Sequence, residues 1–290
     1  MNWKKVSRRR FLAGSGGIAA LALGHAAFAQ SSSDTFTIIV MDPLAAPLSC
    51  DCVKGYAQRN YEKLGKYLEP LIGRPVKVYF AKTLQDTLTK KTGGKADLII
   101  GKESVIRHES QEAKIKAVPI ASLTGKDGST TMTGWVVVPA SDPAVSPTDL
   151  TEHQVLFGPA DCDEKHKAAL ALWKELGLAV PSKPATCPSC SDGATKILDL
   201  SKKGQKAATV ISSYAAPLLE GCGTINKGDL KVIGKTEPVP FIVAFANDSL
   251  SSDLKEALVG HLTAIRKKPE LLEALETKEG FLPISTLKKS

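Results

Sequence analysis

The chain has 290 residues, of which 43% are hydrophobic and 23% are charged. This composition is ordinary for a water-soluble globular protein and excludes a disordered or collagen-like chain. The length is sufficient for two lobes that each bury a core. Residues 1–29 hold five of the basic residues and no acidic residue, so removing them lowers the formal charge from +8 to about +3. The rest of the chain has no basic patch with aromatic residues, which excludes a nucleic-acid partner.

Residues 1–29 have the features of an export signal. Ser7–Leu12 contains three consecutive arginines, an apolar stretch covers residues 18–28, and Ala27–Ala29 forms a small-residue cleavage site. This pattern predicts a twin-arginine signal peptide and therefore a periplasmic protein. The apolar stretch is short and rich in glycine, so we expect no stable membrane insertion after cleavage.

The next part of the chain alternates strand and helix patterns. Residues 36–41 form an apolar run typical of a strand that is buried on both faces, and Asp42-Pro43 ends it. A helix is predicted from Val53 to Ile72, followed by the stop signals of a glycine and a proline. Further strands are predicted at residues 76–80, 96–100 and 117–120. The alternation predicts one parallel α/β lobe.

A strand within residues 131–140 is predicted to carry the chain into a second lobe. Strand patterns there alternate with helix patterns, and two later strands return the chain to the first lobe. A capping box at Ser252-Asp253 and Glu256, and then Pro269, mark two closing helices. The predicted second-lobe strands are 155–158 and 207–212, the helices are 163–176 and 194–200, and the returning strands are 230–233 and 241–245. The predicted lobes are residues 30–138 with 240–290, and residues 139–239.

Several loose patterns, in this order and after a signal peptide, resemble a known family. They are Lys95–Gly101, Trp135–Asp142, Val155–Gly177, Ala207–Tyr214 and Thr236–Pro240. With them the chain resembles the type II periplasmic solute-binding proteins, and among these the phosphonate, phosphite and phosphate binders of ABC importers. The resemblance implies an α/β fold of two lobes, with two inter-lobe strand crossings, that close on a small ligand. It also implies an inner-membrane ABC permease as partner.

The family would present five loops to the cleft, at residues 41–52, 101–104, 158–166, 186–193 and 212–214. Hydroxyl, ammonium and backbone N–H groups in such loops hold an oxyanion. The candidates for this role are Ser49, Lys54, Lys102, Ser104, Ser212, Ser213 and Tyr214.

One loop departs from the family's pattern. Phosphonate binders place a Ser/Thr-rich turn after the first strand of the second lobe, but here the chain has Asp161, Asp163 and Glu164. Carboxylates within a few ångströms of a bound anion would repel it. The alternative is that they cap the following helix and complement its dipole.

Six cysteines leave several interpretations open: Cys50, Cys52, Cys162, Cys187, Cys190 and Cys222. An even count in an exported protein favours disulfides, although a bridge between Cys50 and Cys52 would be strained. Cys187-Pro-Ser-Cys190 has redox or metal-ligand spacing, but no strand before it and no long helix after it is predicted.

Three hypotheses follow. In the first, the ligand is an oxyanion, Cys50 or Cys52 pairs with a cysteine of a neighbouring loop, and Cys187 or Cys190 pairs with Cys222. In the second, Cu(I) or Zn(II) binds in the cleft to Cys50, Cys52, Cys162 and His166. In the third, the protein is a thiol-disulfide or metal-delivery partner of an exported enzyme. The family resemblance favours the oxyanion.

The sequence shows no pattern of a catalytic site. Its five histidines lie outside any HExxH or nucleophile-elbow motif. Ser212 and Ser213 have no base in an evident pattern, so they are interpreted as a hydrogen-bonding wall. We therefore expect a binding protein and not an enzyme, and no cofactor is implied beyond the metal of the second hypothesis.

Overall fold

The computed structural model of this chain describes residues 35–49 and 58–284. The predicted signal peptide and the predicted ligands Cys50, Cys52 and Lys54 lie outside these residues. None of the helices in the described ranges is long and apolar enough to cross a membrane.

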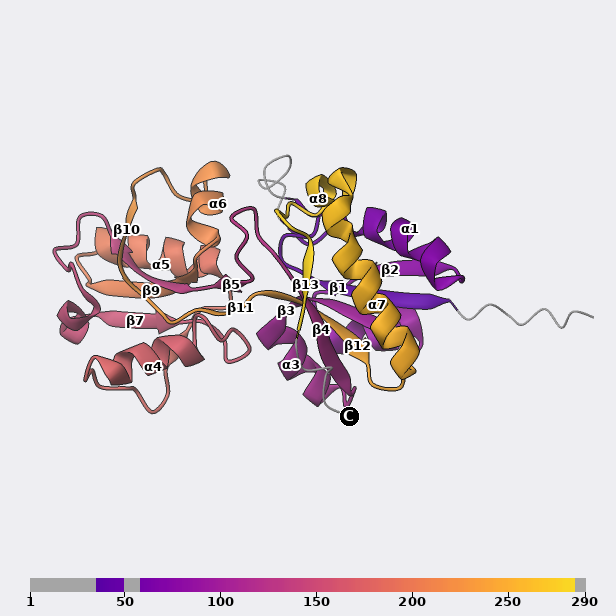
Figure 1. Ribbon diagram of the computed structural model, residues 1–290. Helices are drawn as coiled ribbons and strands as arrows, with labels where there is room; N and C mark the ends of the chain where they lie inside the picture. Colours follow the sequence, from indigo (N-terminus) through magenta and orange to yellow (C-terminus); the bar gives the residue numbers. More distant parts are fainter. Residues whose placement is uncertain (1–34, 50–57, 285–290) are drawn as a thin grey trace, which may run out of the picture. The chain divides into compact units, whose positions relative to one another are not determined.

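Within the described residues, the first sheet has six strands in the order β13-β4-β12-β3-β1-β2 (Figure 1). β1 runs parallel to β2 and β3, but β12 runs antiparallel to β3 and β4. The four strands predicted for a parallel lobe, β1 to β4, do run in the same direction, and the sheet also contains β12 and β13, which run antiparallel to them. The strands are β1 (Phe36–Met41), β2 (Val76–Phe80), β3 (Leu98–Lys102), β4 (Ala117–Leu123), β12 (Ile242–Asn247) and β13 (Phe281–Pro283).

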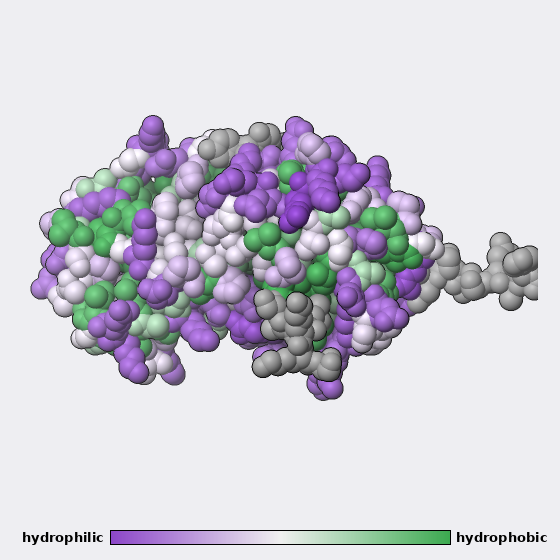
Figure 2. Space-filling view, in the orientation of Figure 1, coloured by the Kyte–Doolittle hydropathy of each residue, from purple (hydrophilic) through white to green (hydrophobic). Residues whose placement is uncertain are grey.

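Helices cover both faces of this sheet. Phe36, Ile38 and Val40 of β1 pack in a core with residues of α1, α7 and α8, whereas Ile39 and Met41 pack with residues of α2 and α3. All six residues of β1 are buried, which confirms the strand predicted to be covered on both sides. The outer surface over α8 is hydrophilic (Figure 2). The helices are α1 (Tyr61–Ile72), α2 (Leu84–Thr87), the π-helical η2 (Leu88–Thr92), α3 (Glu103–Glu112), α7 (Ser252–Ala264), the 3-10 turn η4 (Ile265–Lys267) and α8 (Pro269–Ala274).

In the part of the chain that the structure describes, the second sheet has five strands in the order β10-β6-β9-β7-β8. Helix α4 covers one face, and α5 and α6 cover the other (Figure 1). The strands are β6 (Gly134–Pro139), β7 (Gln154–Phe157), β8 (Ala185–Thr186), β9 (Ala207–Ser212) and β10 (Leu230–Lys235). The helices are α4 (Lys167–Glu175), α5 (Cys190–Lys202), α6 (Ala215–Gly221) and the 3-10 turn η3 (Pro147–Glu152).

Two short strands lie where the chain passes between the lobes. β5 (Thr131–Met132) pairs antiparallel with β11 (Val239–Pro240) as a separate ladder. All of β6 belongs to the second sheet, so the predicted boundary after residue 138 falls inside a strand of that sheet. The sheets therefore divide the chain a few residues earlier than the sequence suggested.

Three predicted helix starts were displaced. α1 begins at Tyr61, because Asn60 is extended and its side chain accepts the N–H of Lys63, and the predicted start at Val53 lies outside the described residues. α4 begins at Lys167 and not at Asp163, since residues 163–166 form turns. α7 is capped by Ser251 and not by Ser252, because the Ser251 hydroxyl accepts the N–H of Leu254. At α1 and α7 the capping side chains of Asn60 and Ser251 meet free N–H groups and set the boundary, whereas α4 has no side-chain cap.

A buried polar network fixes the loop after β1. The carboxylate of Asp42 accepts hydrogen bonds from Arg59 Nη1 at 2.9 Å and from the Tyr61 hydroxyl at 2.5 Å. Arg59 Nε also donates to the carbonyl of Leu275 in the segment after α8. Burial and the adjoining Asp42 carboxylate raise the pKa of Tyr61 well above its usual value, so the phenol remains a donor. The network ties the end of β1 to both the start of α1 and the C-terminal helices.

Replacing Arg59 with Met should test this network, because it leaves the fully buried Asp42 carboxylate without a cation. We expect the free energy of unfolding in urea at pH 7 to fall by about 3 to 5 kcal/mol. The matched control is Lys90→Met, which removes an ion pair whose side chains are 70% and 64% exposed. That change should cost less than about 1 kcal/mol. Equal losses in the two variants would contradict a structural role for the network.

Candidate functional site

A cavity of about 480 Å³ lies at the carboxyl ends of strands from both sheets. In open α/β sheets these ends are where ligands bind. The first lobe contributes Met41, Pro43, Leu44, Leu48, Ser49, Ala81, Lys82, Lys102 and Val105. The second lobe contributes Cys162, Lys165, Pro188, Ser189, Cys190, Tyr214, Ala215, Leu218, Leu219 and Cys222. Each of the five loops predicted to face a cleft supplies at least one of these residues.

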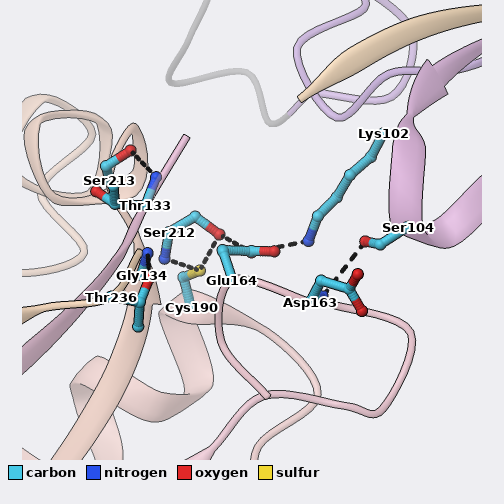
Figure 3. A network of polar contacts seen from close by, with 10 residues as sticks. All are labelled: Lys102, Ser104, Thr133, Gly134, Asp163, Glu164, Cys190, Ser212, Ser213 and Thr236. Atoms are coloured by element: carbon cyan, nitrogen blue, oxygen red, sulfur yellow. Dashed lines mark hydrogen bonds and ion pairs between the residues drawn. The ribbon is translucent and has the colours of Figure 1, made fainter. Parts of the chain in front are cut away.

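A buried ion pair joins the two lobes beside this cavity (Figure 3). Lys102, at the end of β3, places Nζ 2.8 Å from Oε1 of Glu164 in the loop between β7 and α4. The hydroxyl of Ser212, at the end of β9, donates to the same oxygen at 2.6 Å. Oε2 of Glu164 is buried without a hydrogen-bond partner among the described residues. Glu164 itself is completely inaccessible to solvent.

Two glycines allow the Glu164 loop to lie this deep. A Cβ atom at Gly134 of β6 would come within 2.0 Å of the carbonyl oxygen of Glu164, and one at Gly158 within 2.5 Å of Cβ of Lys165. No side chain fits at either position unless the loop moves. The loop therefore packs directly against the backbone of the second sheet, which aims Glu164 toward the first lobe.

The carboxylates of this loop do not act as helix caps. Residue His166 occupies the cap position of α4 and makes no side-chain capping bond. Asp163 instead forms an ion pair of 2.6 Å with Arg107 of α3, and its N–H donates to the Ser104 hydroxyl at 3.3 Å. The capping interpretation was thus wrong for Asp163 and Glu164, because partners in the opposite lobe hold both carboxylates.

Mutual stabilisation keeps the buried pair charged. Burial alone would raise the pKa of Glu164, but the ammonium of Lys102 and the Ser212 hydroxyl bring it below its usual value. Burial likewise disfavours the charged form of Lys102, yet the Glu164 carboxylate raises its pKa. Lys165 is 5% exposed, and burial alone would lower its pKa. Electrostatic interaction with the sulfur groups of Cys190 and Cys162 outweighs this effect and raises the pKa. The described part of the site therefore contains two buried ammonium groups and one buried carboxylate.

An aromatic contact connects the site to the start of β12, the strand that returns to the first lobe. Tyr214 stacks on Phe241 at a centroid distance of 5.2 Å, and the Arg59 guanidinium lies 5.6 Å from the centre of the Phe241 ring. Burial raises the pKa of Tyr214, so its phenol is neutral. The stack places a wall of the cavity next to the strand that returns to the first lobe.

The four described cysteines are all free. The predicted pairing of Cys187 or Cys190 with Cys222 is therefore not formed in this structure. Cys187-Pro-Ser-Cys190 does lie between a strand, β8, and a 13-residue helix, α5, contrary to the sequence prediction. A strand of two residues and the first turn of a helix are too short to give a recognisable hydrophobic periodicity in the sequence. Cys190 Sγ accepts the N–H of Ser212 at 3.4 Å.

The described residues contain no group of three His, Cys, Asp or Glu side chains that could hold a metal ion. Burial raises the pKa of the Cys162 thiol, although the ammonium groups of Lys102 and Lys165 act in the opposite direction. His166 Nδ1 lies 2.8 Å from the carbonyl oxygen of Gly158, and His166 is not among the cavity-lining residues. The metal hypothesis also requires Cys50 and Cys52, which lie outside the described residues, so that site stays a prediction.

The structure brings some of the predicted ligand-binding residues together and uses others elsewhere. Ser49, Lys102, Cys162 and Tyr214 line the cavity. Ser104 and Ser212 contact the acidic loop instead, and the Ser213 hydroxyl accepts the N–H of Thr133 at 3.3 Å. The sequence reasoning missed Lys165 and the pairing of Glu164. The three acidic residues in an otherwise family-like loop were the available signal.

Two layered α/β lobes, two strand crossings and a cavity at the facing strand ends define a type II periplasmic binding protein. The family model described as the periplasmic substrate-binding protein of a phosphonate ABC transporter matches residues 55–287. The chain therefore belongs to this family of binding proteins. Among the curated proteins, none has a sequence that matches this chain.

Solved structures share the fold at low sequence identity. The phosphonate transporter binding component PA3383 of Pseudomonas aeruginosa is 14% identical, with a TM-score of 0.61 over 87% of this chain and 82% of that chain. PhnD1 of Prochlorococcus marinus, solved with methylphosphonate, is 12% identical, with a TM-score of 0.61 over 88% and 94%. XAC2383 of Xanthomonas citri, solved with ATP, is 14% identical, with a TM-score of 0.62 over 87% and 91%. At these identities the similarity establishes the fold alone.

The Lys102→Met variant should show how much the inter-lobe ion pair contributes. At pH 7 the Glu164 carboxylate would be buried without its cation, and we expect the free energy of unfolding to fall by about 3 to 5 kcal/mol. Because the folded-state pKa of Glu164 is lowered, the contribution of the pair is complete above the unfolded glutamate value of about 4.3 and disappears as the pH falls through the folded value. The deficit should therefore shrink in acid.

Urea denaturation from pH 7 down to pH 3 measures this dependence. Lys206→Met, which removes an exposed ion pair with Glu152, is the control and should remain close to wild type. A deficit of the same size at every pH would mean that Lys102 stabilises the protein by packing alone.

Proposed function

We propose that this protein is an exported solute receptor that binds a small oxyanion between its lobes and delivers it to an ABC permease. The observation that carries the proposal is a cavity at the strand ends of both sheets that is lined by two buried lysines, Lys102 and Lys165. The family membership supports the periplasmic receptor role. The arginine-rich segment at residues 8–10 supports export by the twin-arginine route.

The chemistry of the cavity suits an anion better than a cation. Ammonium groups attract the charge, and the Ser49 and Tyr214 side chains supply hydroxyl groups on the cavity wall. A site that excludes water strengthens these interactions relative to an exposed one. The apolar residues of both lobes contribute contact area that grows when the lobes close.

Thermal melts and calorimetric titrations of the mature protein with methylphosphonate, phosphate and phosphite should detect the ligand class. We expect at least one oxyanion to bind, and at about 100 times its dissociation constant it should add roughly 2.7 kcal/mol to the free energy of unfolding. The variant Lys165→Met should lose most of this affinity, whereas the exposed control Lys206→Met should not. Zn(II) and Cu(I) serve as competing ligands. Tighter binding of a metal than of any oxyanion would replace the proposal with the metal hypothesis, in which Cys50 and Cys52 are the ligands to mutate.

Ligand binding should also change the separation of the lobes. β5 and β11 connect them as a two-stranded ladder, the kind of short element at which hinge motion occurs. Small-angle X-ray scattering should show a smaller radius of gyration at saturating ligand than without it. An unchanged radius, with binding verified by calorimetry in the same sample, would show that the receptor does not close on its ligand.

A further inference from the structure

The residues best placed to hold an anion already hold a carboxylate of the chain itself. Lys102 and Ser212 both contact Oε1 of Glu164, at 2.8 Å and 2.6 Å. These two residues come from the strand ends of opposite lobes, where an oxyanion would be held. Glu164 is fully buried, so water does not screen its charge. A negative charge is therefore built into the site before any ligand arrives.

The remaining cation is Lys165. It lines the cavity and is 5% exposed, yet no described carboxylate lies within ion-pair distance of its ammonium group. Its neighbours in the cavity include the thiols of Cys162 and Cys190. Lys82 also lines the cavity, but it is exposed and its charge is screened by solvent. Counting the buried ammonium and carboxylate groups, the described part of the site has a net charge of plus one.

This charge count distinguishes anions of different valence. One negative charge on the ligand neutralises Lys165 and completes the site. Among the described residues, a second negative charge has no further buried cation to balance it, because the Glu164 carboxylate already neutralises Lys102. At a separation of several ångströms and an effective dielectric constant near 20, the attraction of one unneutralised ammonium group would strengthen binding by about 100-fold, and the Glu164 carboxylate cancels this attraction.

The walls of the cavity indicate what else the ligand carries. Leu44 and Leu48 of the first lobe and Leu218 and Leu219 of the second lobe line it. Its volume of about 480 Å³ lies in the range of pockets that enclose organic ligands. An inorganic anion would leave this apolar surface without contacts, whereas an alkyl or aryl substituent would bury it.

We propose that the site selects a singly charged organic anion, with Lys165 balancing the charge and the leucines contacting an apolar substituent. This inference rests on the oxyanion-binding function proposed above and specifies its ligand class. Glu164 is the determinant of valence, because it neutralises Lys102 and so removes the attraction that this ammonium group would offer to the second charge of a dianion.

The test compares two tetrahedral anions with the same tail. Butanesulfonate is a monoanion throughout, whereas butyl phosphate is a dianion at pH 7.5 and largely a monoanion at pH 5, since its second pKa is about 6. Calorimetry of wild type at pH 7.5 should show butanesulfonate binding at least about 10-fold tighter. At pH 5 butyl phosphate should approach the affinity of butanesulfonate, whose own affinity changes little. This comparison needs no variant.

The variant Glu164→Gln keeps an acceptor for Lys102 and Ser212 but removes the charge. It should raise the affinity for butyl phosphate at pH 7.5 by about 10-fold or more relative to butanesulfonate. The matched control is Glu152→Gln, which removes a carboxylate paired with Lys206 at 2.6 Å on the surface. It should leave the ratio of the two affinities unchanged.

The outcomes separate the two proposals. If butyl phosphate binds wild type at pH 7.5 as tightly as butanesulfonate, the selection by charge is wrong while the oxyanion receptor stands. If none of the sulfonate, phosphate ester or smaller oxyanions binds up to millimolar concentration, the receptor proposal fails and the charge selection with it. A Glu164→Gln variant that binds both anions in the wild-type ratio would also overturn the assigned role of Glu164.

Discussion

A carboxylate that water cannot reach remains ionised only where a cation neutralises it, and the arrangement of the cleft depends on this requirement at Glu164. The cation is Lys102, which belongs to the other lobe. The loop that carries Glu164 can approach only because Gly134 and Gly158 present no side chain to it. A feature of backbone packing in one sheet therefore determines an electrostatic contact with the other.

A second buried ion pair stabilises the site from within the first lobe. Asp42 and Arg59 hold the end of β1 to the start of α1, and the same guanidinium lies against Phe241. Buried ion pairs add less net stability than their short distances suggest, because both ions lose hydration. The larger effect of the two buried ion pairs is on geometry, because each pair holds its charged side chains, and the segments that carry them, in one arrangement. Here one pair fixes a wall of the cavity and the other fixes how the lobes meet.

The cavity combines groups that a simple phosphate receptor would not need. Three free thiols, Cys162, Cys190 and Cys222, lie on its wall with two buried lysines and several leucines. The thiol of Cys190 also contacts Ser212, so it belongs to the network that holds Glu164. Family membership identifies a class of binding protein, whereas the choice of ligand depends on side chains such as these.

The sequence by itself determined the two-lobed α/β architecture, since the strand and helix patterns appear in their order along the chain. The resemblance of its patterns to a known family also indicated which loops line the cavity, among them those after Met41, Lys102 and Ser212. It identified the acidic loop after β7 as a departure from the family.

Only the tertiary structure decided what that loop does. A carboxylate near a helix start caps the helix in the absence of other partners, and no local pattern reveals that Lys102 and Arg107, some 60 residues earlier in the chain, supply better ones. The antiparallel entry of β12, the short strand β8 and the pairing of Asp42 with Arg59 were hidden for the same reason. Periodicity records which faces of an element are apolar, whereas ion pairs between distant segments depend on how the chain folds back on itself.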